Sequence, residues 1–314
     1  MAQVTAQMVK ELRERTQAGM SDCKTALVEA EGDMEKAIEI IQKKGLAKSV
    51  KRASAAATEG EVRALVFAEG KSGVMVEVNS QTDFVARNES FVAFVGDLLK
   101  LASETPAGAN LLEQRMPSGK TVEEARAELS GTLGENIQVR RWERFDLQGS
   151  GLVHSYVHMG GKIGVLVEIG TESNEVAAHE AVKRFADDTA MQIAAMAAQF
   201  LNRSQVPAET LDKQAGIFLA LMHKEKEEGI LKAPESSWPK IIEGKKAKWY
   251  TEVCLLEQES VIVPGTSVGK LLEQLSKEVG STVTIRRFAR FERGEGITKK
   301  VDDFAAEVAK MAGV

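Results

Sequence analysis

The chain has 314 residues, of which 43% are hydrophobic and 28% are charged, and its net charge is −5. This length predicts two or three domains, and the composition is typical of a soluble globular protein. The acidic balance argues against a dominant nucleic-acid-binding surface. No apolar run approaches the roughly 20 residues that a membrane-spanning helix needs.

Two features of the sequence indicate a cytosolic protein. The segment Met1–Lys10 lacks the apolar core of a signal peptide. The sequence has two cysteines, Cys23 and Cys254, which are too few for a disulfide framework or a zinc site. We expect both to be reduced and buried.

Residues 1–53 are predicted to form a module of three short helices. The first is capped by Thr5, a break follows at Gly19, and the third is expected to end at Gly45. Such a module resembles the ubiquitin-associated fold, which is a binding unit and not a catalytic one. The basic run Lys43–Arg52 at its end is interpreted as a solvated linker, with RNA contact as the alternative.

From Glu61 the apolar period changes to two, which predicts strands. A hairpin is expected over residues 61–78, and helices at 90–103 and about 121–129. A further strand at 136–145 returns to the sheet. This combination of helices with antiparallel strands predicts an α+β fold.

The pattern then repeats within the chain. The segment 161–169 copies 70–78, a helix at about 175–198 follows, and the segment 283–291 copies 137–145. We therefore expect a duplicated core. Its expected parts are a first α+β subdomain, residues 54–146, and a second, residues 147–296.

Two helical segments stand outside this duplicated pattern. An antiparallel helical hairpin is expected as an insertion at about 207–256, and whether it mediates self-association stays open. Residues 297–314 are predicted to form an amphipathic C-terminal helix. Such a terminal helix must dock on its own core or on a partner.

A polar turn, Asn79–Asn88, joins the first hairpin to the first long helix and holds Phe84 beside Asp83. Phe84 could fold back into the core, or it could project as an aromatic anchor at an interface. The second copy has Thr171-Glu172-Ser173 at the corresponding turn, with no aromatic residue. Because the duplication kept the scaffold without the aromatic, this difference favours a function for Phe84 beyond folding.

No catalytic, cofactor-binding or metal site is predicted. The run Val263–Leu271 looks like a phosphate-binding loop, but three residues separate its glycines and Leu271 follows its lysine. His154 and His158 share one face of a predicted strand with Tyr156, and no cysteine lies near them. We interpret this face as polar surface or interface, with a metal site or an unrecognised enzyme as the alternative.

Two motifs resemble the bacterial elongation factor Ts family, and the similarity extends over essentially the whole chain. They are the tetrad T-D-F-V, Thr82–Val85, and the run Leu12–Lys24. The resemblance implies a non-enzymatic cytoplasmic factor that binds the GTPase elongation factor Tu with GDP, displaces Mg²⁺ and promotes GDP release. The residues implied in Mg²⁺ dislocation are Thr82, Asp83, Phe84 and Val85, and the further implied partner contacts are Arg13, Met20, Leu133, Gly134 and His158.

One segment departs from the pattern of that family. Glu257–Val263 stands where the family pattern has a shorter turn that contains phenylalanine, so its local structure is not predicted. An alternative function also remains at this point. The helical module at residues 1–53 could serve a non-catalytic adaptor that binds a partner protein.

Overall fold

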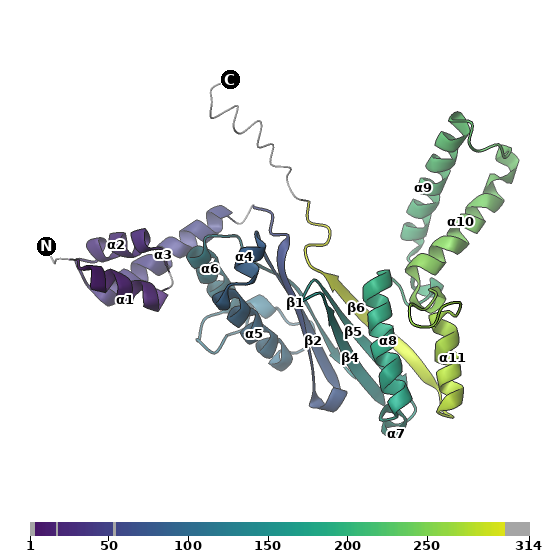
Figure 1. The fold of residues 1–314 in the computed structure, drawn as a ribbon, viewed down its shortest axis with the longest axis horizontal. Helices are drawn as coiled ribbons and strands as arrows, with labels where there is room; N and C mark the ends of the chain where they lie inside the picture. Colours follow the sequence, from purple (N-terminus) through teal and green to yellow (C-terminus); the bar gives the residue numbers. More distant parts are fainter. Residues whose placement is uncertain (1–3, 17, 53–54, 299–314) are drawn as a thin grey trace.

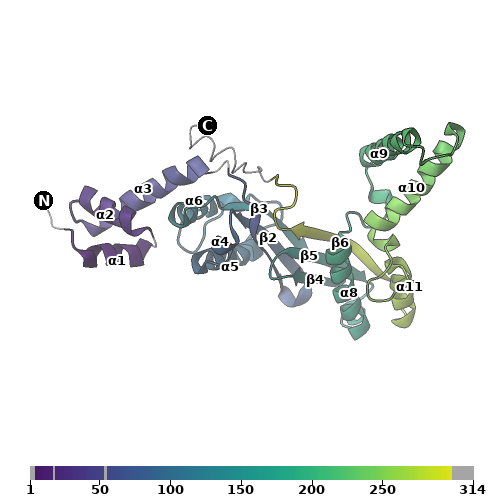
Figure 2. The same cartoon turned by 45° about the horizontal axis from the view of Figure 1, so that its top comes forward.

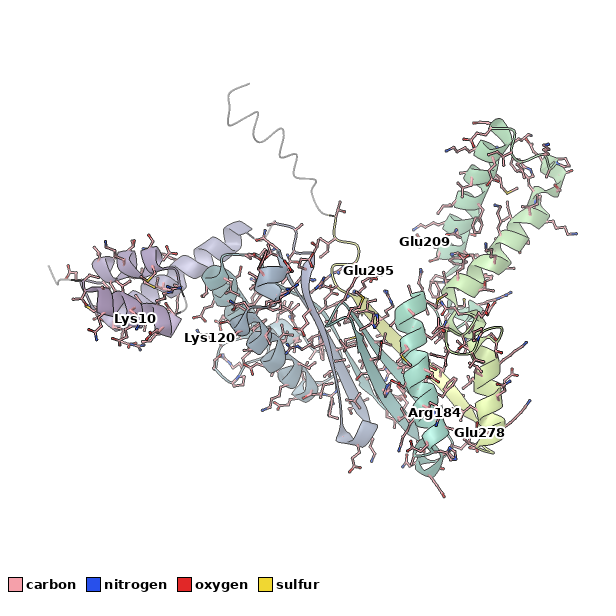
Figure 3. The ribbon with its side chains drawn as sticks, in the orientation of Figure 1. Lys10, Lys120, Arg184, Glu209, Glu278 and Glu295 are labelled. Carbon is pink, nitrogen blue, oxygen red and sulfur yellow. The ribbon has the colours of Figure 1, made fainter. Side chains whose placement is uncertain are left out.

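The computed structural model describes residues 4–16, 18–52 and 55–298. These residues form an elongated molecule, with three helices at one end, two β-sheets in the middle and a helical hairpin at the other end (Figures 1 and 2). Among the side chains in Figure 3, Lys10 and Glu209 mark the helical parts on either side of the sheets. The expected helix at 297–314 lies almost wholly outside the described residues.

The N-terminal module, residues 4–52, consists of three helices with a small core of their own. The expected end of the third helix at Gly45 is wrong, because that helix continues past Gly45 to Arg52. The side chains of residues 46–52 lie outside the described part, so the interpretation of the basic run stays a prediction. The helices are α1 (Ala6–Thr16), α2 (Met20–Glu29) and α3 (Met34–Arg52).

Near its expected end, α3 contacts the first repeat. Gly45 of α3 faces Gly131 of α6 (Val122–Leu133), and a Cβ on Gly131 would lie 2.4 Å from the Cα of Gly45. Glycine costs about 1 kcal/mol in a helix, but at Gly131 it allows the two backbones to cross in direct contact, whereas a Cβ on Gly45 would lie 3.6 Å from the Cα of Gly131. This crossing joins the N-terminal module to the rest of the protein.

The first repeat, residues 55–146, is a three-stranded antiparallel sheet in the order β1-β2-β3, covered by helices on one face. All 9 residues of the central strand β2 are buried. Helix α6 is longer than expected and ends where Gly134 adopts a φ of 79°. The elements are β1 (Glu59–Phe67), β2 (Ser72–Ser80), α4 (Asp83–Ala86), α5 (Glu89–Glu104), α6 and β3 (Gln138–Asp146).

The second repeat, residues 147–296, has the same plan, with the strand order β4-β5-β6. The helix expected at about 175–198 is divided in two. The ring Nδ1 of His179 accepts the backbone N–H of Ala181 at 3.2 Å, which caps a new helix at that point. The elements are β4 (Gly151–His158), β5 (Ile163–Thr171), α7 (Asn174–Ala177), α8 (Glu180–Met196), α11 (Val268–Glu278) and β6 (Val283–Glu292).

The insertion in the second repeat is an antiparallel pair of helices, α9 (Ala208–Glu227) and α10 (Trp238–Val253), which project from the sheets (Figure 1). The buried ring of Trp238 meets the ring of His223 edge-on, with 4.8 Å between the centroids. With these elements, the expectation of an α+β fold is confirmed.

The segment Glu257–Val263 follows the hairpin and forms a loop held by two buried glutamines. Nε2 of Gln192 donates to Oε1 of Gln258 at 3.2 Å, and Oε1 of Gln192 accepts the N–H of Val261 at 2.8 Å. Val261, Ile262 and Val263 stay between 41% and 48% exposed. Hydrogen bonds of the two buried glutamines therefore anchor this loop.

The two sheets pack together through the faces that their helices leave uncovered. The contacts follow an approximate twofold symmetry that matches the sequence repeat. The guanidinium carbon of Arg141 lies 4.3 Å from the ring centroid of Phe291, and that of Arg287 lies 4.1 Å from the ring centroid of Phe145. The shared core consists of Val62, Met75, Phe145, Val153, Leu166 and Phe291.

Each half of this interface also contains a fully buried glutamate. Glu77 pairs with Arg140 and Arg141, and Glu168 pairs in the same way with Arg286 and Arg287. Burial by itself would raise the pKa of Glu168. Hydrogen bonds from the backbone N–H of Gln148 and from both arginines outweigh that effect and leave the pKa below its ordinary value.

Candidate partner-binding site

The polar turn after β2 is a four-residue helix, α4, fixed by caps on both sides. The side chain of Thr82 accepts the backbone N–H of Val85 at 3.4 Å and begins α4. The side chain of Asn88 accepts the N–H of Ser90 at 2.9 Å and begins α5. We call residues 82–87 the α4 turn. Its two caps follow directly from the local sequence.

The α4 turn presents its aromatic residue to solvent. Phe84 is 82% exposed, whereas Val85 and Ala86 pack against the core of the first repeat. Val85 therefore anchors the turn, and Phe84 does not fill the core. An exposed ring contributes little to the stability of the fold, so folding does not account for Phe84.

Asp83 is the first residue of α4 and pairs with Arg87, with 3.0 Å between Oδ2 and Nη2. Both side chains are well exposed, so solvent screens the pair and it adds little to the stability of the fold. The α4 turn thus offers one aromatic ring flanked by one carboxylate and one guanidinium.

Glu135, which the sequence reasoning missed, fastens the α4 turn to the end of α6. Its Oε2 accepts the N–H groups of Gln81 and Thr82 at 3.1 and 3.0 Å, and its Oε1 accepts the hydroxyl of Thr82 at 2.6 Å. Because Glu135 follows Leu133 and Gly134, these two predicted contact residues are brought beside the α4 turn. No local pattern signals this contact, since more than fifty positions separate the two segments.

The second repeat has the same capped short helix without an aromatic residue. Its short helix α7 is capped by Ser173, whose Oγ accepts the N–H of Val176 at 3.3 Å, as Thr82 does for Val85. The sequence comparison took Thr171–Ser173 as the corresponding turn, a range that ends two positions too early. The structural counterpart of Phe84 is Glu175, which is also exposed. The fold therefore tolerates either side chain at this position.

The other predicted contact residues lie on separate elements. Arg13 on α1 and Met20 on α2 are exposed on the N-terminal module, and Met20 is 53% exposed. His158 ends β4, and its Nδ1 lies 2.9 Å from the hydroxyl of Tyr156. The hairpin after His158 reaches the first repeat, because the N–H of Val62 donates to the carbonyl of Gly161 at 2.8 Å.

The two histidines of β4 have different hydrogen-bond partners. Nε2 of His154 lies 3.1 Å from a carboxylate oxygen of Asp187 on α8, whereas His158 pairs with Tyr156. Among the described residues, no group of three or more His, Cys, Asp or Glu could hold a metal ion. The polar-surface interpretation of this face agrees with these pairings.

Neither cysteine offers a reactive thiolate. Both are buried and free, as expected. Burial raises the pKa of both thiols, that of Cys254 to about 11, so they stay protonated near neutral pH. A nucleophilic role for either residue would require a thiolate that these surroundings disfavour.

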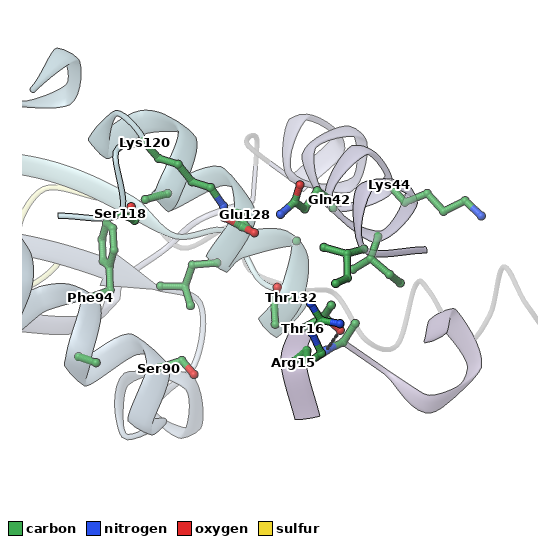
Figure 4. A pocket seen from close by; sticks show the side chains of 18 of the residues that line it. Arg15, Thr16, Gln42, Lys44, Ser90, Phe94, Ser118, Lys120, Glu128 and Thr132 are labelled. Atoms are coloured by element: carbon green, nitrogen blue, oxygen red, sulfur yellow. Dashed lines mark hydrogen bonds and ion pairs between the residues drawn. The ribbon is translucent and has the colours of Figure 1, made fainter. Parts of the chain in front are cut away.

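A cavity of ≈ 450 Å³ lies between the N-terminal module and the first repeat (Figure 4). Ile41 and Phe94 contribute apolar walls, and Lys120 points across it to pair with Glu128. Its lining does not include the α4 turn.

Within the described ranges, no helix is long and apolar enough to cross a membrane.

Comparison with known proteins identifies the family. Residues 81–295 match the family model described as Elongation factor TS. The chain belongs to the elongation factor Ts family. The matched range begins just before the α4 turn and includes Leu133, Gly134 and His158, whereas Arg13 and Met20 precede it.

Full-length relatives extend the similarity to the N-terminal module. The protein named Elongation factor Ts from Clostridium perfringens is 47% identical over 312 residues, which cover 99% of both chains. Those of the same name from Symbiobacterium thermophilum and Clostridium kluyveri are 44% and 46% identical and cover 100% and 98% of both chains. The family assigns the chain to translation elongation, and thus to protein biosynthesis.

Proposed function

We propose that the protein is a guanine-nucleotide exchange factor that binds elongation factor Tu with GDP, displaces Mg²⁺ and promotes release of the GDP. The observation that carries the proposal is Phe84, a ring 82% exposed on a turn that is capped and anchored on both sides. Aromatic residues are enriched at protein interfaces, where a few buried anchors carry most of the binding energy.

The mechanism is one of coupled binding equilibria. A factor that binds the nucleotide-free GTPase more tightly than the GDP-bound form must weaken GDP binding by the same factor. Phe84 would supply this difference in affinity by inserting between side chains of the GTPase and moving the element that supports Mg²⁺. Thr82, Asp83 and Val85 would hold the ring in place. The protein itself makes and breaks no covalent bond, so we class it as a non-enzyme without a cofactor.

Further contacts would come from three regions outside the α4 turn. Exposed residues of the N-terminal module and of the β4–β5 hairpin, together with the end of α6, would meet the same partner. Because translation takes place in the cytoplasm, we assign the protein to that compartment. The proposed contact residues are Arg13, Met20, Leu133, Gly134 and His158.

We further propose that residues 1–53, 54–146, 147–296 and 297–314 are separate units. Support comes from the distinct hydrophobic clusters of the N-terminal module and of the two repeats. The N-terminal module also exposes Met20 and Val28, by 53% and 59%. This apolar surface favours a second candidate function, an adaptor that binds a partner through this module alone.

One experiment tests the exchange function and separates it from the adaptor. Fluorescent GDP is loaded on elongation factor Tu with Mg²⁺, and its release is followed after mixing with the full chain and an excess of unlabelled GDP. An exchange factor accelerates release many-fold at catalytic concentrations. An adaptor binds without changing the release rate, and that result would refute the exchange function.

A further inference from the structure

The contact between Glu135 and the α4 turn is one half of a reciprocal arrangement. While Glu135 accepts hydrogen bonds from Gln81 and Thr82, the side chain of Gln81 accepts the backbone N–H of Asn136 at 2.8 Å. Asn136 in turn donates through Nδ2 to the carbonyl of Ala55 at 2.7 Å. We call Glu135 and its three hydrogen bonds the Glu135 clamp.

The second repeat has a clamp of opposite polarity. There the carboxylate stands on the turn, because Glu172 is the counterpart of Gln81. It accepts the N–H and hydroxyl of Thr282 at 3.4 and 2.6 Å and the hydroxyl of Ser281 at 3.0 Å. Thr282 precedes β6 as Asn136 precedes β3. Both repeats therefore join the turn to the returning strand by hydrogen bonds, whichever of the two segments supplies the carboxylate.

In the first repeat, the clamp also connects two groups of proposed contact residues. Glu135 directly follows Leu133 and Gly134, so the clamp holds these two residues and the α4 turn with Phe84 as one unit. Ser130 of α6 strengthens the unit by donating its hydroxyl to the carbonyl of Glu135. A four-residue helix cannot hold itself in place, since forming its first turn fixes several dihedrals for a single hydrogen bond. Without the clamp, α4 would keep the packing of Val85 and Ala86, the Thr82 cap, and the hydrogen bond from the hydroxyl of Ser80 to the carbonyl of Thr82 at 2.9 Å.

We propose that Glu135 is a positioning residue for nucleotide exchange, which holds the α4 turn so that Phe84 meets the partner already oriented. This inference rests on the proposed function. A side chain that is oriented before binding loses less conformational entropy when it binds. The effect of Glu135 therefore passes through Phe84 and depends on the ring being present.

The experiment is a double-mutant cycle on stimulated GDP release from elongation factor Tu. It compares the full chain with Glu135→Ala, Phe84→Ala and the double variant. We expect Glu135→Ala to slow release about tenfold, the factor that loss of one hydrogen bond to a charged group commonly costs. In the Phe84→Ala background the same substitution should change the rate less than about twofold, because coupled residues are not additive.

Two further variants separate positioning from general stability. Glu135→Gln keeps an oxygen for the two N–H groups, and its amide can donate to the Thr82 hydroxyl, so it should restore exchange to within about threefold of wild type. The matched control is Glu172→Ala, which removes the equivalent clamp of the second repeat. The melting temperature should fall by similar amounts in Glu172→Ala and Glu135→Ala. Glu172→Ala, however, should stimulate GDP release at the wild-type rate.

The outcomes distinguish the inference from the function on which it rests. If the unmodified chain does not accelerate GDP release, the exchange function is refuted and the positioning role with it. If the unmodified chain accelerates release and Phe84→Ala lowers the acceleration by about an order of magnitude but leaves a measurable rate, the function stands. In that case a wild-type rate for Glu135→Ala, or an effect of equal size with and without Phe84, refutes the positioning role alone.

Discussion

Truncation of Phe84 to alanine separates its contribution to the fold from its contribution to binding. The ring is 82% exposed, so its removal takes almost no apolar area out of the core. Substitutions at such positions usually change the free energy of unfolding by less than about 0.5 kcal/mol. We therefore expect the melting temperature of Phe84→Ala to stay within about 2 °C of wild type.

The expected effect on the complex is much larger. A ring buried at the centre of an interface commonly contributes about 2–4 kcal/mol to complex stability. Since each 1.4 kcal/mol is about a factor of ten, even 2 kcal/mol weakens binding roughly 30-fold. Stimulated release of fluorescent GDP should fall by an order of magnitude or more at a fixed, subsaturating concentration of the variant.

Two control substitutions calibrate this measurement. Phe91 is fully buried on α5, so Phe91→Ala should cost about 3–5 kcal/mol of folding stability. Glu175 occupies the place of Phe84 in the second repeat, and Glu175→Ala should leave both stability and exchange unchanged. A large fall in the melting temperature of Phe84→Ala, or exchange at the wild-type rate, would show that the reasoning about the exposed ring is wrong.

Three further predictions concern the scaffold. Because the folded-state pKa of Glu168 is lowered, its contribution to stability is present above the unfolded pKa of about 4.3 and lost as the pH falls below it. Glu168→Gln should therefore cost about 3 kcal/mol at pH 7 and flatten the loss of stability on acidification, as measured by urea unfolding. Gly131→Ala should loosen the contact of α6 with Gly45 and speed proteolytic release of the N-terminal module, whereas Gly216→Ala, which meets open space on α9, should not. Deletion of residues 1–53 should leave a cooperatively unfolding core with weakened exchange, and exchange at the full rate would contradict a role for the module.

Much of the candidate site could be predicted from the sequence because its determinants are local. The caps at Thr82 and Asn88 act over two or three residues, so the position of the α4 turn follows from the order of side chains. The internal repeat could also be predicted, since the alternating apolar residues of the first copy recur in the second with the same glycines. The comparison with the second copy then indicated that the ring of Phe84 was not required by the scaffold.

The sequence reasoning failed at two helix boundaries. Gly45 has the local character of a helix end, yet α3 continues past it to Arg52 and crosses α6 at Gly131, where an added Cβ would lie 2.4 Å from the Cα of Gly45. The division between α7 and α8 was also missed, because a histidine cap at His179 is an unusual local signal.

The sequence by itself therefore determined the main strands and long helices, their duplication and the polar character of the α4 turn. The tertiary structure alone decided what holds that turn. Glu135 meets Gln81 and Thr82 because β3 lies beside β2, and the buried Glu77 and Glu168 find their arginines on neighbouring strands. Hydrogen bonds and ion pairs act over a few ångströms in space, whatever the separation along the chain, so their partners are settled when the sheets form.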